Sequence, residues 1–187
     1  WITGLFGVQS ILFFSLVAWL PAILTEGSVS SQAITTCVAL FPIVGIPCTI
    51  FVPPIAQRLK RQRLFGASIG MICVIGIVAL FFVNADTTAI VATVIVGFAL
   101  GAPFCLCMYY FGVRTENPED SSKLSSISQT FGYLMAAIGP ACLGLLVDLS
   151  GSWFLPLTVM LALSIVLVIC GWKSGSGTIP AGPAKTD

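Results

Sequence analysis

The chain has 187 residues, of which 57% are hydrophobic and 8% are charged, with eight Lys and Arg residues, seven Asp and Glu residues and no histidine. Soluble domains carry about a quarter charged residues, so this composition excludes a soluble globular domain. With a formal net charge of only +1, we predict no nucleic-acid partner. The apolar residues form long unbroken runs rather than short alternating segments, so we predict an all-α membrane protein embedded in a lipid bilayer.

The first predicted span covers residues 2–24. We expect Trp19 and Pro21 to close it, as an interfacial aromatic residue and a helix-ending residue. After a polar loop, the second span covers residues 32–55 and contains four prolines, Pro42, Pro47, Pro53 and Pro54. Proline removes a helical hydrogen bond, so this span should be kinked or broken.

The third and fourth spans, at residues 64–83 and 88–113, each carry two glycines four residues apart. They are Gly66 with Gly70, and Gly97 with Gly101. Such pairs allow helix backbones to approach each other closely in a membrane. We therefore expect tight helix packing at these positions.

The fifth span, residues 124–147, follows a helix-start signal in which Asn117 is the N-cap and Pro118 the first helical residue. We expect residues 124–130 to form a Ser-rich turn before the apolar part begins. The sixth span covers residues 153–172. Residues 1–172 would thus form one six-helix transmembrane unit, and the Gly- and Pro-rich residues 173–187 a disordered cytoplasmic tail.

The charges of the loops sort to two sides of the membrane. If six spans are counted, all the basic residues fall on one side: Arg58, Lys60, Arg61, Arg63, Arg114, Lys123, Lys173 and Lys185. The opposite loops hold only Glu26, Asp86 and Asp148. By the positive-inside rule both chain ends are cytoplasmic and the protein is a multi-pass protein of the plasma (inner) membrane.

The chain begins with Trp1 and enters an apolar span at once. Because it shows neither a basic segment nor a small-residue cleavage site there, we predict no signal peptide. We expect a fragment from which an N-terminal part is missing.

No Asp, Glu, Lys or Arg lies within a span, so we expect any solute site to consist of uncharged residues. Gln9 and Phe13 of the first span lie at a depth similar to that of Gln129 and Tyr133 in the fifth, with Phe104 of the fourth span near them. Amides and aromatic rings suit a small planar solute, so these five residues are the predicted substrate-binding residues. The alternative is that Gln9 and Gln129 join helices purely as packing contacts.

The remaining polar residues indicate no catalysis. We find no nucleophile paired with a base, no phosphate-binding loop and no metal-ligating constellation, so we predict neither an enzyme nor a bound cofactor or metal. The seven cysteines lie in apolar runs and are predicted to be small buried hydrophobic residues. Tyr109, Tyr110, Trp19 and Trp153 are predicted to belong to interfacial aromatic belts.

Two glutamine-bearing segments resemble a known family. They are GVQSILF at 7–13 leading to AWLP at 18–21, and Gln129 leading to GYL at 132–134, AA at 136–137 and GP at 139–140. They resemble the cyanate permease and nitroimidazole transporter family of the major facilitator superfamily, as do Arg114-Thr115 and the GSW segment at 151–153. The chain departs from the superfamily's cytoplasmic loop signature at Gln57, where an Asp is usual.

This resemblance implies that the chain is the C-terminal six-helix half of a twelve-helix transporter. It also implies secondary transport of a small solute, a cyanate-like anion or a small planar organic molecule, by alternating access. The partners would be the bilayer, the solute and the missing N-terminal half. Two alternatives stay open: a six-helix membrane scaffold or assembly protein without a solute pathway, and a proton- or cation-coupled carrier of amino acids or drugs.

Overall fold

A computed structural model describes residues 1–115 and 117–176. These residues form helices and short connections, and no strand occurs among them. The helices are α1 (Ile2–Glu26), α2 (Ser31–Val44), α3 (Ile46–Arg58), α4 (Gln62–Phe81), α5 (Asp86–Val113), α6 (Pro118–Ser150) and α7 (Phe154–Ser174). The all-α prediction is confirmed.

Six helical segments of the described chain are long and apolar enough to cross a membrane, with α2 and α3 together forming one of them. The predicted interruption of this segment is confirmed: α2 ends and α3 begins on either side of Gly45. Pro42 precedes this point and Pro47 follows it. Since neither proline can donate a backbone hydrogen bond, the helical ladder weakens there.

Two local predictions about helix ends are wrong. Pro21 does not end α1, which continues to Glu26, because a bundle can re-satisfy the carbonyl that a proline leaves without a donor. Residues 124–130 are helical rather than a turn, since α6 starts earlier, at Pro118. That start is fixed by Asn117, whose side chain accepts a hydrogen bond from the backbone N–H of Asp120 at 2.9 Å, as predicted.

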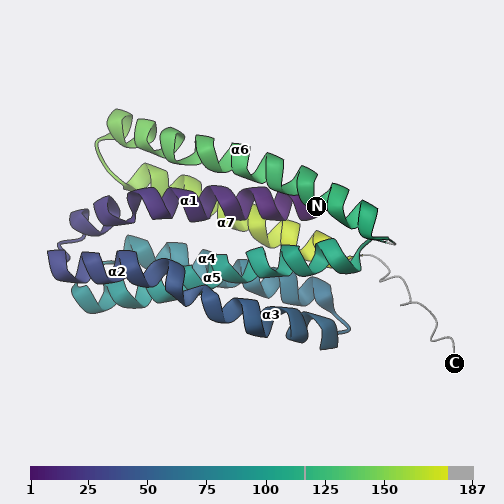
Figure 1. Cartoon of the computed structure of the whole chain (residues 1–187). Helices are drawn as coiled ribbons and strands as arrows, with labels where there is room; N and C mark the ends of the chain where they lie inside the picture. The colour runs from purple at the N-terminus through teal and green to yellow at the C-terminus, as the bar shows by residue number, and fades with distance from the viewer. Residues whose placement is uncertain (116, 177–187) are drawn as a thin grey trace, which may run out of the picture.

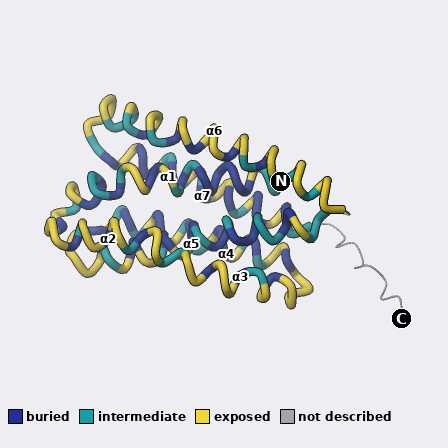
Figure 2. Tube along the Cα trace, viewed as in Figure 1, coloured by how far each residue is buried: buried dark blue, intermediate teal, exposed yellow. Residues whose placement is uncertain are grey.

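The helices form a bundle in which α1 and α5 are central (Figure 1). α1 packs mainly against α6 and α7, α4 lies between α5 and α7, and α5 also packs against α2 and α3. Buried residues concentrate along α1 and α5, whereas α6, α2 and α3 expose much of their surface (Figure 2). These exposed helix faces are strongly apolar, as expected for lipid or protein contact within a membrane.

The two ends of the bundle differ in charge. The start of α1, the α3–α4 and α5–α6 connections and the end of α7 lie together at one end (Figure 1), where the Lys173 ammonium group is 5.9 Å from the Trp1 ring centroid. All seven basic residues among the described part of the chain belong to this end. Of the tail predicted at 173–187, Lys173 and Ser174 belong to α7, and residues 177–187 lie outside the described residues.

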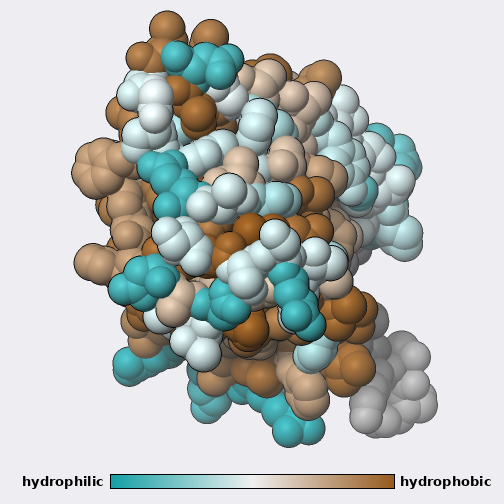
Figure 3. Space-filling view, turned by 90° about the vertical axis from the view of Figure 1, so that its left-hand side faces the viewer, coloured by the Kyte–Doolittle hydropathy of each residue, from teal (hydrophilic) through white to brown (hydrophobic). Residues whose placement is uncertain are grey.

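At the opposite end, two carboxylates join separate connections. Glu26 accepts hydrogen bonds from the Ser152 hydroxyl (3.2 Å) and the Trp153 backbone N–H (3.1 Å). Asp86 accepts from the backbone N–H (2.8 Å) and the hydroxyl (2.7 Å) of Ser30. Figure 3 shows this end, where hydrophilic side chains lie among hydrophobic ones. Glu26 therefore links the end of α1 to the start of α7, and Asp86 links the start of α5 to the start of α2.

Some predicted surface and core positions are corrected. Tyr110 is fully buried, with the Arg114 guanidinium 5.0 Å from its ring centroid, because it lies on the central helix α5. Trp153 is buried against Trp19, with ring centroids 5.4 Å apart. Neither Tyr110 nor Trp153 is thus a lipid-facing belt residue. The cysteines are buried except Cys142, which lies on the outward face of α6.

Candidate functional site

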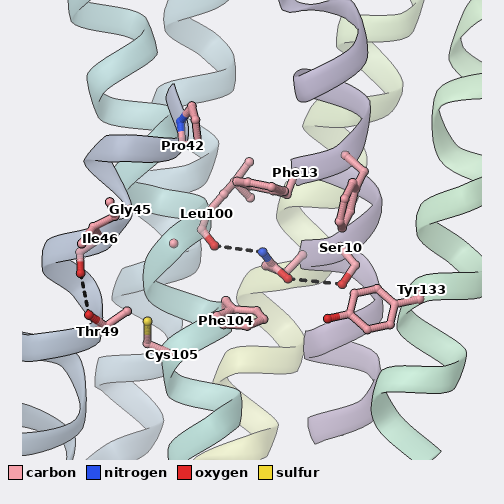
Figure 4. Close-up of a pocket in the computed structure, with 13 residues that line it drawn as sticks. Ser10, Phe13, Pro42, Gly45, Ile46, Thr49, Leu100, Phe104, Cys105 and Tyr133 are labelled. Atoms are coloured by element: carbon pink, nitrogen blue, oxygen red, sulfur yellow. Dashed lines mark hydrogen bonds between the residues drawn. The ribbon is translucent and has the colours of Figure 1, made fainter. Parts of the chain in front are cut away.

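A pocket of about 250 Å³ lies between α1, the α2–α3 bend, α5 and α6 (Figure 4). Its wall combines aromatic rings, aliphatic groups and a few uncharged polar groups. The lining residues are Gln9, Ser10, Phe13, Phe14, Pro42, Gly45, Ile46, Thr49, Leu100, Gly101, Phe104, Cys105 and Tyr133. Residues from four separate chain segments thus meet in the middle part of the spans.

The α1 side of the pocket carries a short hydrogen-bonded chain. The buried Gln9 amide donates to the carbonyl of Leu100 on α5 at 3.0 Å, and the Ser10 hydroxyl donates to the Gln9 carbonyl oxygen at 3.3 Å (Figure 4). Leu100 directly follows Ala99, whose carbonyl lacks its helical donor because Pro103 has no N–H. Gln9 therefore joins the two central helices while its side chain also lines the pocket.

The aromatic walls are held by rings behind them. Phe6 is fully buried, and its ring centroid lies 5.9 Å from that of Phe104 and 5.8 Å from that of Tyr133. Phe13 stacks on the buried Phe41, with centroids 5.3 Å apart and planes 25° apart. Such ring pairs contribute about 0.5–1.5 kcal/mol beyond their buried area. The flat surfaces that face the pocket are therefore pre-positioned.

Tyr133 is an exposed polar residue of the site. Its side chain is 47% exposed, and its hydroxyl points from α6 toward the space between α1 and α5 (Figure 4). The neighbouring Gly132 packs directly on the Phe6 ring, which brings α6 close to α1. Among the described residues none hydrogen-bonds the Tyr133 hydroxyl, so this group is available to a solute.

Gln129 is the one predicted site residue that does not line the pocket. It is half-buried on α6, one turn before Tyr133 toward the basic end, and its amide donates to the Ser125 hydroxyl at 2.6 Å. The other four predicted residues, Gln9, Phe13, Phe104 and Tyr133, all line it. Gln129 and Tyr133 are four residues apart, so they share one side of α6. They lie one helical turn apart along the helix, and only Tyr133 reaches the pocket.

The α2–α3 wall of the pocket was not predicted from the sequence. Pro42, Gly45, Ile46 and Thr49 face it, and the Thr49 hydroxyl donates back to the Ile46 carbonyl at 2.7 Å (Figure 4). The prolines predicted a bend in this segment, but they did not indicate which helices would pack against the bend. Ser10 next to Gln9, and Cys105 next to Phe104, were also missed.

The electrostatic character of the pocket follows from this lining. None of the lining residues is an Asp, Glu, Lys or Arg. A solute would therefore be held by hydroxyl and amide hydrogen bonds and by contact with aromatic faces. In the part of the chain that the structure describes, no group of three or more Cys, Asp and Glu residues could hold a metal ion.

The chain is similar in sequence to known transporters. Residues 2–185 match the Major Facilitator Superfamily profile. The chain is 33% identical over 175 residues to the uncharacterized transporter YycB of Bacillus subtilis (strain 168), covering 94% of the chain and 44% of that protein. It is 31% identical over 174 residues to the 2-nitroimidazole transporter of Escherichia coli (strain K12), covering 93% and 44%. With the cyanate transport protein CynX of Escherichia coli (strain K12), it shares 26% over 156 residues, covering 83% and 40%.

The chain spans less than half the length of these relatives. Its six membrane-capable helices fit one half of the twelve-helix fold that the resemblance implied. The profile match covers nearly the whole chain, and the helical bundle agrees with it. The chain therefore belongs to the Major Facilitator Superfamily.

Proposed function

We propose that the chain is the C-terminal half of a secondary transporter that moves a small solute across the inner membrane by alternating access. The observation that carries this proposal is the pocket within the spans, where Gln9, Phe13, Phe104 and Tyr133 converge. A bundle that served only as a scaffold would need no polar hydroxyl directed into such a space. In this interpretation the pocket is one half of the solute site, and a second six-helix half completes it.

The lining favours a planar, aromatic or conjugated solute. Phe13 and Phe104 supply flat walls, and Tyr133 and Thr49 supply hydroxyls that can pair with polar groups at its edge. The named solutes of two relatives are both small: 2-nitroimidazole is a planar ring and cyanate a linear conjugated anion. For an anion such as cyanate, the positive group would come from the second half, because this half contributes none to the pocket.

The residues around the pocket form an exposed apolar surface that a second six-helix half would cover. Phe14 and Ile46 line the pocket and are still 39% and 59% exposed, and Ile43 and Ile50 beside them are also exposed. In the proposed full-length transporter, this apolar surface faces the other half and Gln129 lies between the pocket and the cytoplasmic opening. The basic end of the bundle faces the cytoplasm.

Cysteine labelling in the full-length protein tests whether the pocket is a water-filled pathway. In a cysteine-free background, Tyr133→Cys should react with a polar thiol reagent, and a planar solute such as 2-nitroimidazole should protect it. The matched control is Ile165→Cys, also about half exposed and near mid-helix, but on α7 away from the pocket. If the thiol reagent labels neither position 133 nor position 165 in the absence of solute, the result would favour the scaffold alternative.

A further inference from the structure

A second concave site lies at the basic end of the bundle, on helices that do not line the pocket. We call it the basic groove: it has a volume of about 770 Å³ and lies between the α3–α4 connection, the first turn of α4 and the end of α7. The residues of the groove that matter here are Lys60, Arg61, Arg63, Leu64, Trp172 and Gly175. Neither the solute site nor the packing of the spans accounts for this combination.

Within the described residues, no ion pair balances the positive charge of the basic groove. Lys60, Arg61 and Arg63 are all exposed, and no carboxylate of the described residues forms an ion pair with them. The ion pair that occurs in the described chain joins Lys123 to Glu119 on α6 at 2.7 Å. The first turn of α4 also contains no acidic residue. Three neighbouring cations that form no ion pair with a described carboxylate are suited to an external anion.

At the floor of the basic groove, two helices meet backbone to backbone. Gly66 of α4 packs directly on Gly171 of α7, and Gly175 packs against the backbone of Gln62 and Arg63. No side chain separates the helices at these points. The cations are thereby held beside the end of α7.

The basic groove continues into an apolar surface toward the middle of the spans. Trp172 and Leu64 border it and are 40% and 48% exposed. Further along the same two helices, exposed apolar side chains continue, at Met71 and Ile75 of α4 and at Ile165 and Ile169 of α7. A Trp between charged and apolar zones is typical of the membrane–water interface.

We propose that the basic groove binds an anionic phospholipid. Its phosphodiester headgroup contacts Lys60, Arg61 and Arg63, and an acyl chain lies along the exposed face of α4 and α7. Arg and Lys side chains make charge-assisted hydrogen bonds to phosphate oxygens, and basic sites between transmembrane helices are suited to such headgroups. A lipid complements both the cations of the groove and the apolar face beside it, whereas a soluble phosphate complements only the cations. The site does not depend on the proposed transport function.

Native mass spectrometry of the purified, delipidated full-length protein tests this site by titration with phosphatidylglycerol and phosphatidylcholine. We expect preferential binding of phosphatidylglycerol. Lys60→Gln/Arg63→Gln should weaken that binding about thirtyfold, the equivalent of two surface charges. The matched control Arg58→Gln/Lys123→Gln also removes one Arg and one Lys from the same end but leaves the groove intact. It should change the affinity less than twofold.

Three results would overturn the proposal: equal binding of the two lipids, an equal loss in both double variants, or full displacement of phosphatidylglycerol by inorganic phosphate at constant ionic strength. The last result would indicate a soluble anion as the ligand. Lys60→Gln alone, outside any helix, serves if the double variant unfolds, and its expected loss is about fivefold. An unchanged affinity in this single variant would count against the site.

Discussion

Two polar side chains of the pocket differ in what they do for the fold. Gln9 is 4% exposed and bonded to Leu100 and Ser10, so it contributes to the packing of α1 on α5. Tyr133 is 47% exposed, and its hydroxyl has no hydrogen-bond partner among the described residues. A substitution at Tyr133 should therefore affect solute binding alone, whereas one at Gln9 should affect both solute binding and packing.

Tyr133→Phe removes one hydroxyl and leaves the ring contact with Phe6 in place. We expect the KM for uptake of the solute by the full-length protein to rise about two- to tenfold, the equivalent of one hydrogen bond. The thermal unfolding temperature in detergent should not change. Tyr109→Phe, a half-buried tyrosine outside the pocket, is the control. If the two variants have the same KM, the Tyr133 hydroxyl does not contact the solute.

Gln9→Ala should abolish uptake and also lower the stability of the protein by about 1 kcal/mol, because it removes the link from α1 to the Leu100 carbonyl. Uptake assays and denaturation of the purified protein measure the two effects. Gln32→Ala, at an exposed position near the start of α2, should change neither. Wild-type uptake by Gln9→Ala would exclude Gln9 from the solute site.

At the scale of the elements, glycines set how closely the helices approach. Gly66 and Gly171 bring α4 and α7 into backbone contact, and Gly101 lies against the backbone of Gly45 beside the α2–α3 bend. In a membrane, helix association depends on such close packing, since burial from lipid gives little hydrophobic gain. The positions of the helix pairs therefore depend on residues without side chains.

Gly66→Leu should separate α4 from α7, because its Cβ would meet the Gly171 carbonyl oxygen. The expected loss of stability is about 1–3 kcal/mol, seen as a lower unfolding temperature and less folded protein in the membrane. Gly112→Ala is the contrasting change: nothing lies within 4 Å of its added Cβ. Since Ala favours helix by up to about 1 kcal/mol over Gly, that variant should be as stable as the wild type or more so. A stable Gly66→Leu variant would contradict the tight α4–α7 contact.

At the scale of the whole molecule, the two ends of the bundle carry opposite charge, which predicts one orientation in the membrane. In a cysteine-free full-length protein, Ser28→Cys should react with an impermeant thiol reagent in intact cells. Ser122→Cys, also exposed but at the basic end, should react only after the membrane is permeabilised. The reverse pattern would show that the basic end faces outward.

The sequence by itself determined the helical membrane class, the number of spans, the interruption near Pro42 and Pro47, and the start of α6 at Asn117. These features follow from apolar run length, missing backbone donors and local capping, which are all properties of neighbouring residues. It also indicated four residues that line the pocket, because polar and aromatic residues stand out in an apolar span.

Only the tertiary structure decided which helices surround the pocket. It placed the α2–α3 bend and Thr49 at the wall, left Gln129 bonded to Ser125 instead, and buried Tyr110 within the bundle. The basic groove likewise joins residues 60–64 to residues 172–175, more than a hundred positions apart in the chain. The physical reason is that a helical period shows which residues share a face, whereas packing between helices sets the depth of each residue and what that face meets.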